Sequence, residues 1–212
     1  MTVVQRLRAE ATDASPPTRV NAMKINIGDM ALGQKPGGFT ESLTGQGGAV
    51  RWQVLEDPST PAHRVIAETS RDTSDYRFPL CIWDDLRAKN AQVTIRFKAV
   101  EGSVDQAAGI VVRLLDADNY YVARANALED NVRLYKVVAG VRRQMAGRNL
   151  PVLNNVWHTL SLRSEGEELE VWFNGASVIQ IRDQTFLDAG KVGIWTKADS
   201  VTHFAELDIE SR

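Results

Sequence analysis

Polar and apolar residues alternate without a slip in Gln92-Val-Thr-Ile-Arg-Phe-Lys98, and nearly so in Glu168-Leu-Glu-Val-Trp-Phe173. Successive side chains of a β-strand point to opposite faces, so this period of two places the apolar residues of a segment on one face. The pattern is typical of an antiparallel strand with one face against a core and the other in water. Both segments therefore predict half-buried antiparallel strands.

Short turn signals separate further apolar runs. They are Asp116-Ala-Asp-Asn119, Ala139-Gly140 and Asn174-Gly175, of which Asn-Gly is a favoured two-residue hairpin turn. Roughly ten strands are expected after residue 49, and a period of 3.6 is not sustained anywhere beyond a short turn at Trp83–Lys89. The predicted fold class is all-β, as a two-sheet antiparallel sandwich of the jelly-roll type.

The chain is predicted to hold one domain. Residues 1–20 are polar and contain prolines, and we expect them to form a flexible N-terminal segment; residues 21–212 contain no linker-like stretch and are expected to form a single jelly-roll domain. The stretch from Met30 to Arg51 is rich in glycine and is predicted to be a long ordered loop. Arg6, Arg8 and Glu10 interrupt the place where a signal peptide would have its apolar core, so either the chain is cytoplasmic or a leader has been replaced.

Composition excludes several classes of protein. The 212 residues carry 25 Lys and Arg against 27 Asp and Glu, without the basic excess of a nucleic-acid binder. Cys81 is the only cysteine, so neither an internal disulfide nor a thiolate metal cluster is expected. Charged residues interrupt every apolar run before the roughly 20 residues that a membrane span needs, so no membrane insertion is expected.

Charge is unevenly spread along the chain. Between Asn131 and Ser164 there is no Asp or Glu, whereas six basic residues fall there: Arg133, Lys136, Arg142, Arg143, Arg148 and Arg163. One interpretation is a basic patch for an anionic ligand. The simpler interpretation, which the sequence favours, is that neighbouring hairpins exchange cross-strand ion pairs with carboxylates from elsewhere in the chain.

Motifs of known catalytic sites are mostly missing from the sequence. His63, His158 and His203 are far apart and are expected to be structural or surface residues. Glu206-Leu-Asp-Ile-Glu210 places three carboxylates on one face of a strand, with a spacing similar to that of retaining glycosidases. Because this triplet ends two residues before Arg212, a solvated face on the last strand is the favoured interpretation.

Other side chains suit carbohydrate binding. Sugar sites stack an aromatic ring on the apolar face of a pyranose and use planar polar groups for its hydroxyls. Residue types of this kind are found at Trp195, Tyr120, Arg113, Arg124, Asn126, Lys197 and Asp199. Tyr120, Arg124 and Asn126 have the same strand parity, so they are predicted to line one face.

Three long segments resemble the 3-keto-disaccharide hydrolase-like domain. They run from Val104 to Arg113, from Asp116 to Lys136 and from Gly190 to Ser200. The resemblance covers about residues 25–210 and implies a concanavalin A-like, laminin-G-like jelly roll that acts on or binds glycans and is usually exported by bacteria. The family pattern reads Phe-Asp-Asp in the last strand, where this chain has Phe204-Ala-Glu206.

Three functions follow from the resemblance and the residue types. The first is a carbohydrate-recognition domain that binds a saccharide or glycan on its concave sheet through Tyr120, Asn126, Trp195, Lys197 and Asp118. The second is an enzyme that cleaves 3-keto-glycosides, in which Arg113 or Arg124 polarises the ketone and Asp199, Asp118 or His203 moves protons. The third is a structural or protein-interaction module of the laminin-G-like kind. Related jelly rolls often hold calcium, for which Asp29 and Asp208 are the candidate ligands.

Overall fold

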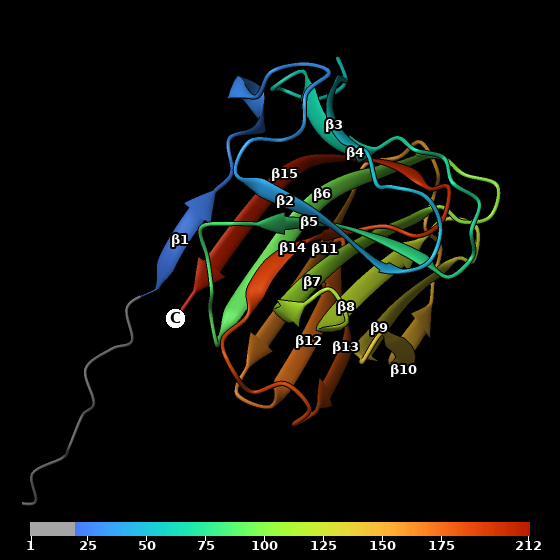
Figure 1. Ribbon diagram of the computed structural model, residues 1–212. Helices are drawn as coiled ribbons and strands as arrows, with labels where there is room; N and C mark the ends of the chain where they lie inside the picture. Colours follow the sequence, from blue (N-terminus) through green and yellow to red (C-terminus); the bar gives the residue numbers. More distant parts are fainter. Residues whose placement is uncertain (1–19) are drawn as a thin grey trace, which may run out of the picture.

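A computed structural model describes residues 20–212 as an all-β sandwich of two antiparallel sheets (Figure 1). The elements are β1 (Asn21–Lys24), η1 (Ile27–Asp29), β2 (Phe39–Gly45), β3 (Trp52–Glu56), β4 (Arg64–Glu68), β5 (Arg77–Trp83), β6 (Ala91–Glu101), β7 (Ala107–Asp116), β8 (Asn119–Asn126), β9 (Asn131–Val138), β10 (Val141–Asn149), β11 (His158–Glu165), β12 (Glu168–Phe173), β13 (Ala176–Arg182), β14 (Lys191–Trp195) and β15 (Val201–Ser211). The predicted fold class is confirmed.

The strands are divided between an A sheet and a B sheet. The A sheet has the order β13-β12-β11-β6-β15-β4-β3, with β1 added along β15, and the B sheet has the order β10-β9-β8-β7-β14-β5-β2. Neighbours in space are often distant in sequence: β15 pairs with β6, and β14 lies between β5 and β7. The chain therefore passes repeatedly from one sheet to the other.

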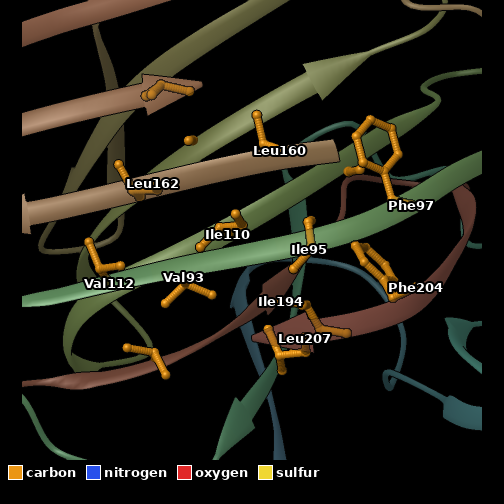
Figure 2. Packing of buried hydrophobic residues seen from close by; sticks show 14 of the residues in the cluster. Val93, Ile95, Phe97, Ile110, Val112, Leu160, Leu162, Ile194, Phe204 and Leu207 are labelled. Atoms are coloured by element: carbon orange, nitrogen blue, oxygen red, sulfur yellow. The ribbon is translucent and has the colours of Figure 1, made fainter. Parts of the chain in front are cut away.

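The main hydrophobic core lies between the two sheets. Figure 2 shows side chains of β6, β7, β11, β14 and β15 pointing toward one another, among them Val93, Ile95, Ile110 and Leu160. These residues have no exposed surface, whereas the alternate residues of β6 remain partly exposed. The alternation in the sequence thus separates core residues from solvent-facing residues, as predicted. Burial of each aliphatic side chain contributes about 1.5–3 kcal/mol to the free energy of folding.

A second apolar cluster lies on the other face of the B sheet. It consists of residues from β5, β7, β8, β9 and β14: Phe78, Leu80, Ile82, Ala107, Val111, Leu114, Tyr120, Val122, Tyr135, Val137 and Trp195. Trp195 has no exposed surface and stacks on Phe78 with ring centroids 5.4 Å apart. This face is turned away from the A sheet and would be exposed to water if the B sheet were flat. Its burial therefore requires the edges of the B sheet to curl toward each other across this face.

Contacts between distant strands show how the B sheet curls. The Tyr76 hydroxyl, just before β5, donates to the carbonyl of Gly140 at 3.0 Å and accepts from the Arg142 backbone N–H at 2.8 Å, in the β9–β10 hairpin. At the end of β2, the Thr44 hydroxyl bonds to the carbonyl of Ala117, in the β7–β8 turn. The β2–β5 corner therefore folds across the sheet and covers the second cluster.

The observed strands test the sequence predictions. The three predicted turns connect β7 to β8, β9 to β10 and β12 to β13, which confirms them. The expected loop at 30–51 is wrong in part, because β2 lies within it and is paired along its whole length with β5. Residues 84–89 contain turns but no helix, and no helix in the range 20–212 has the length and apolar character to cross a membrane. Apart from Val20, the segment predicted to be flexible lies outside the described residues.

Gly109 in β7 is a test of the curled sheet. A Cβ atom at this position would come 2.8 Å from Cε3 of Trp195, whose ring is held by Phe78 on its other side. We expect Gly109→Ala to lower the free energy of unfolding by about 1–3 kcal/mol, because the ring has no free space to move into. Urea unfolding of the purified chain measures this loss.

Gly37→Ala is the matched control. Gly37 has no atom within 4 Å of its built Cβ and needs no left-handed backbone, so this variant is expected to keep or slightly raise the unfolding free energy. An equal loss in both variants would contradict the role given to Trp195.

Candidate functional site

Charged side chains gather around the uncovered end of the curled face. Lys197, just after β14, bonds through Nζ to Asp75 at 2.5 Å and to Asp105 Oδ2 at 2.9 Å. Asn126, at the end of β8, donates from Nδ2 to Asp105 Oδ1 at 2.5 Å. Asp105 is 1% exposed, whereas the side chain of Asp75 is 78% exposed. A chain of polar contacts thus leads from the protein interior to water.

Asp199 holds the loop that carries Asp105. Its carboxylate accepts the backbone N–H groups of Ser103 at 2.7 Å, Val104 at 3.0 Å and Asp105 at 3.1 Å, together with the Ser103 hydroxyl. Burial by itself would raise the pKa of Asp199, but these donors lower it below the usual value. Asp199 therefore acts on the site through Asp105.

Burial and pairing act in opposite directions on the Asp105–Lys197 pair. Burial raises the pKa of Asp105, against the lowering effect of Lys197. Burial would lower the pKa of Lys197, but the hydrogen bonds that it donates to Asp75 and Asp105 raise it. The net result is a buried carboxyl that is easier to protonate than an ordinary aspartate, beside a lysine that stays protonated.

Arg124 forms a second ion pair near Lys197. Its Nη2 donates to Glu129 at 2.7 Å and to Asn131 at 2.5 Å, and its guanidinium lies 5.7 Å from the centre of the Tyr135 ring. Arg124 is 2% exposed, whereas half of the Glu129 side chain is in water. Burial alone would raise the pKa of Glu129, but hydrogen bonds from Arg124 and Asn131 and the charge of Lys197 lower it to about 2.

Arg142 of β10 completes the site. Its guanidinium carbon lies 4.5 Å from the ring centres of both Phe78 and Tyr135 and 5.9 Å from that of Trp195. The pKa of Asp75 is lowered first by the hydrogen bond and charge of Lys197, and the charge of Arg142 adds to this effect. We name the five residues Asp75, Arg124, Glu129, Arg142 and Lys197 the charged mouth.

The structure brings together only some of the residues predicted from sequence. Arg124, Asn126, Lys197 and Asp199 converge at the charged mouth, and Tyr120, Arg124 and Asn126 face the same side of the B sheet, as their parity predicted. Trp195 and Tyr120 belong to the buried second cluster and have no exposed surface. Neither ring therefore presents a face to a sugar, and the expected stacking on Trp195 or Tyr120 is not supported by this geometry.

Arg113 and Asp118 lie apart from the charged mouth. Arg113 donates to three backbone carbonyls, those of Lys89 at 3.0 Å, Phe186 at 2.7 Å and Gly166 at 2.6 Å. It is 1% exposed, so its donors hold loops together, and a catalytic role beside Arg124 does not fit this position. Asp118 lies in the β7–β8 turn, where its carbonyl accepts the Gly140 N–H.

The proposed calcium ligands do not assemble a metal site. Asp29, in η1, accepts from Asn26 Nδ2 at 2.6 Å, and Asp208 lies on β15 opposite Thr94 and Lys24. No three His, Cys, Asp or Glu side chains within residues 20–212 are placed to hold a metal ion. Calcium takes about six to eight oxygen ligands, so these two carboxylates do not fit it.

The remaining singled-out residues lie on the A sheet. His158 is buried against Phe97 and Phe173, and His203 pairs with Asp57 at 2.7 Å, in agreement with structural roles. In the carboxylate triplet of β15, Glu206 pairs with Arg96 at 3.4 Å and with Lys24 at 3.7 Å. These contacts fit the solvated face that the sequence favoured.

Sequence reasoning missed Asp75, Asp105 and Glu129 and did not place Arg142 at a sugar site. Asp75 and Glu129 lie in short connections outside the regular strands, where no periodicity marks a functional residue. For Arg142 one signal was present, since it lies in the stretch without Asp or Glu.

Comparisons with known proteins support the fold. No family model matches the sequence, and no curated protein matches it. Among solved structures, carbohydrate binding module CBM66 from Bacillus subtilis is similar over 77% of this chain and 91% of its own, with 19% identity and a TM-score of 0.60. The exoplasmic/lumenal domain of VIP36, in a Ca²⁺- and mannose-bound form, is similar over 76% of this chain and 81% of its own, with 11% identity and a TM-score of 0.56.

A third similar structure belongs to a larger protein. The GH43 protein BlXynB from Bacillus licheniformis matches 76% of this chain but only 37% of its own length, with 12% identity and a TM-score of 0.54. At these identities the comparisons show the fold, which is that of the galectin-like jelly-roll sandwiches.

Glu129 gives the charged mouth a predictable pH dependence. Its folded-state pKa of about 2 lies below the ordinary value of 4.5, so its contribution to stability is complete above about pH 4.5 and is lost as the pH falls toward 2. Glu129→Gln removes this contribution, so we expect the variant to be less stable at pH 7 and to lose less stability between pH 4.5 and 2. Urea unfolding across this pH range measures the difference.

Asp85→Asn serves as control, because Asp85 is exposed and makes no hydrogen bond or ion pair with any residue of the described chain. Its pH profile is expected to follow the unmodified protein. A Glu129→Gln profile parallel to that of the unmodified protein would contradict the Arg124–Glu129 pairing.

Proposed function

We propose that this protein is a saccharide-binding domain and that the sugar binds at the charged mouth. The observation that carries the proposal is the placement of half-exposed or exposed carboxylates, Glu129 and Asp75, on cations that are themselves fixed, Arg124 and Lys197. Carboxylates held in this way can accept sugar hydroxyls without first losing side-chain freedom. Fold similarity to a carbohydrate binding module and to a mannose-bound domain supports the same function.

The family and the compartment are part of the proposal. The segments Val104–Arg113, Asp116–Lys136 and Gly190–Ser200 support membership of the 3-keto-disaccharide hydrolase-like family. The usual export of that family supports a periplasmic or extracellular location. In this assignment Asn126 and Asp199 are positioning residues, because they hold Asp105 and act on the ligand through it.

Binding is tested by calorimetric titration of the full chain with a panel of oligosaccharides. We expect at least one to bind with a Kd between about 10 µM and 1 mM, or about −7 to −4 kcal/mol. Glu129→Gln is expected to weaken that binding about tenfold, the value of one hydrogen bond to a charged group.

Trp172→Ala on the A sheet is the control. Trp172 is a partly exposed ring that stacks with Arg163, with 5.4 Å between guanidinium carbon and ring centre, and offers the other plausible sugar platform. Binding lost in Trp172→Ala but kept in Glu129→Gln would move the site to the A sheet. Absence of binding to every oligosaccharide at millimolar concentration would refute the proposed function.

A second candidate function is cleavage of a 3-keto-glycoside. Oxidation at C3 acidifies the proton at C2, so elimination needs a general base to take that proton, an electrophile at the ketone oxygen and an acid to protonate the leaving group. Glu129, the half-exposed carboxylate beside Arg124, is the candidate for the base. Asp105 favours this candidate, because burial raises its pKa and Lys197 lies 2.9 Å away. Lys197 and Arg124 both lie in this site, and they are the two candidates for the electrophile at the ketone oxygen.

Incubation with 3-keto-trehalose, followed by detection of released glucose, tests the second candidate. Asp105→Asn keeps the size of the side chain but removes the acid, and we expect it to abolish product formation. It also removes a buried partner of Lys197, so the melting temperature is expected to fall, and rates are compared at a temperature at which the variant is still folded. If the unmodified protein releases glucose no faster than the Asp105→Asn variant, this candidate function is eliminated.

A further inference from the structure

Resting on the proposed function, we infer that the charged mouth is built for an acidic saccharide and that Arg142 binds its carboxylate or sulfate group. The starting observation is the stretch Asn131–Ser164. Of its six basic residues, Lys136 pairs with Asp183 at 2.7 Å and Arg163 pairs with Glu170 at 2.8 Å. Within residues 20–212, no ion pair is formed by the other four: Arg133, Arg142, Arg143 and Arg148. Cross-strand ion pairs therefore do not account for most of this charge.

Arg142 differs from the other three because aromatic rings hold it, whereas Arg133 is held by hydrogen bonds from its guanidinium to Asn149 and Val132. Its guanidinium lies between the rings of Phe78 and Tyr135, at 4.5 Å from each centre. Its backbone N–H is bound by Tyr76, whose hydroxyl also holds Gly140 at the turn of the same hairpin. Stacking on aromatic faces immobilises an arginine without using its hydrogen-bond donors.

The donors of Arg142 are unused. The guanidinium has five N–H groups, and none of them bonds to any residue that the structure describes. Its Nη1 atom is buried and without a hydrogen-bond partner, as is Nε of the neighbouring Arg124. Arg113, which is buried to a similar depth as Arg124, instead uses its donors on three carbonyls. A fixed cation with unused donors is the arrangement that binds carboxylate and sulfate groups in planar, paired hydrogen bonds.

No carboxylate of the mouth forms an ion pair with Arg142. Glu129 is paired with Arg124, and Asp75 and Asp105 share Lys197. With Asp105 included, three cations balance three carboxylates, so the mouth attracts no anion by net charge, and Arg142 is its one cation without an ion-pair partner within 4 Å among residues 20–212. A single guanidinium with unused donors beside two exposed carboxylates favours a ligand with one acidic group among several hydroxyls. A densely charged polyanion such as a nucleic acid would be repelled by Asp75 and Glu129.

The test compares matched acidic and neutral sugars. Glucuronosyl-xylotriose carries one carboxylate, and its methyl ester is the matched neutral sugar. The monosulfated disaccharide of κ-carrageenan and its desulfated form make the same comparison for sulfate. We expect the full chain to bind at least one acidic member about tenfold or more tightly than its neutral counterpart, in calorimetry at 50 mM salt.

Variants separate Arg142 from general electrostatics. Arg142→Met keeps an apolar side chain between the two rings and is expected to remove the preference for the acidic member. Arg148→Gln removes the same charge from the same strand, outside the aromatic clamp, and is expected to change affinity less than threefold. Arg142→Lys keeps the charge but loses the paired donors, so an intermediate affinity is expected. Melting temperatures confirm that each variant is folded.

The outcomes distinguish this inference from the proposed function. Equal affinity for both members of each pair, equal losses in Arg142→Met and Arg148→Gln, or tighter binding of a short oligodeoxythymidylate than of either acidic sugar would overturn the inference. Binding of neutral oligosaccharides alone would overturn it and leave the proposed function standing. Failure of every saccharide to bind would overturn both.

Discussion

The closure of the B sheet over its own far face is the constraint on which the site depends. Two side-chain hydroxyls, of Tyr76 and Thr44, bind turns on strands that lie several positions away in the sheet. Each such hydrogen bond contributes about 1 kcal/mol, whereas each fully buried aromatic ring of the second cluster contributes about 1.5–3 kcal/mol. Apolar burial therefore supplies most of the stabilisation, and the hydroxyls select which turns meet.

This closure also determines where polar groups can function. A concave sheet that is filled by Phe78, Trp195 and Tyr120 leaves no room for a sugar along its length. Charged and polar groups gather instead at the end of the face, where connections between strands supply Asp75, Asp105 and Glu129. Phe78, which helps to fill this face, also lies 4.5 Å from the guanidinium of Arg142, as does Tyr135, so the packing that buries Trp195 and Tyr120 also supports a cation.

Individual residues show how far local sequence reasoning extends. Parity placed Tyr120, Arg124 and Asn126 on one face because β8 is regular. Arg113 was singled out by residue type alone, and its direction could not be predicted, because the pairing of β7 with β8 shifts register between Val112 and Asp116 and Arg113 has a φ of 49°. A β-bulge with a left-handed residue turns a side chain away from the direction that alternation predicts. The strand β2 was missed for a related reason, since its pairing with β5 and not its own composition makes it a strand.

The sequence by itself determined the all-β class, the sandwich, the hairpin turns at 116–119, 139–140 and 174–175, and an uneven charge pattern with a stretch free of acids. These properties depend on side chains a few residues apart, which alternation and turn chemistry report directly. Only the tertiary structure decided that Trp195 is packing, that Arg113 is an internal support, and that Arg142 is a clamped cation without a counter-ion. Those outcomes depend on which strands meet when the B sheet curls, and such contacts join residues as far apart in sequence as Tyr76 and Gly140.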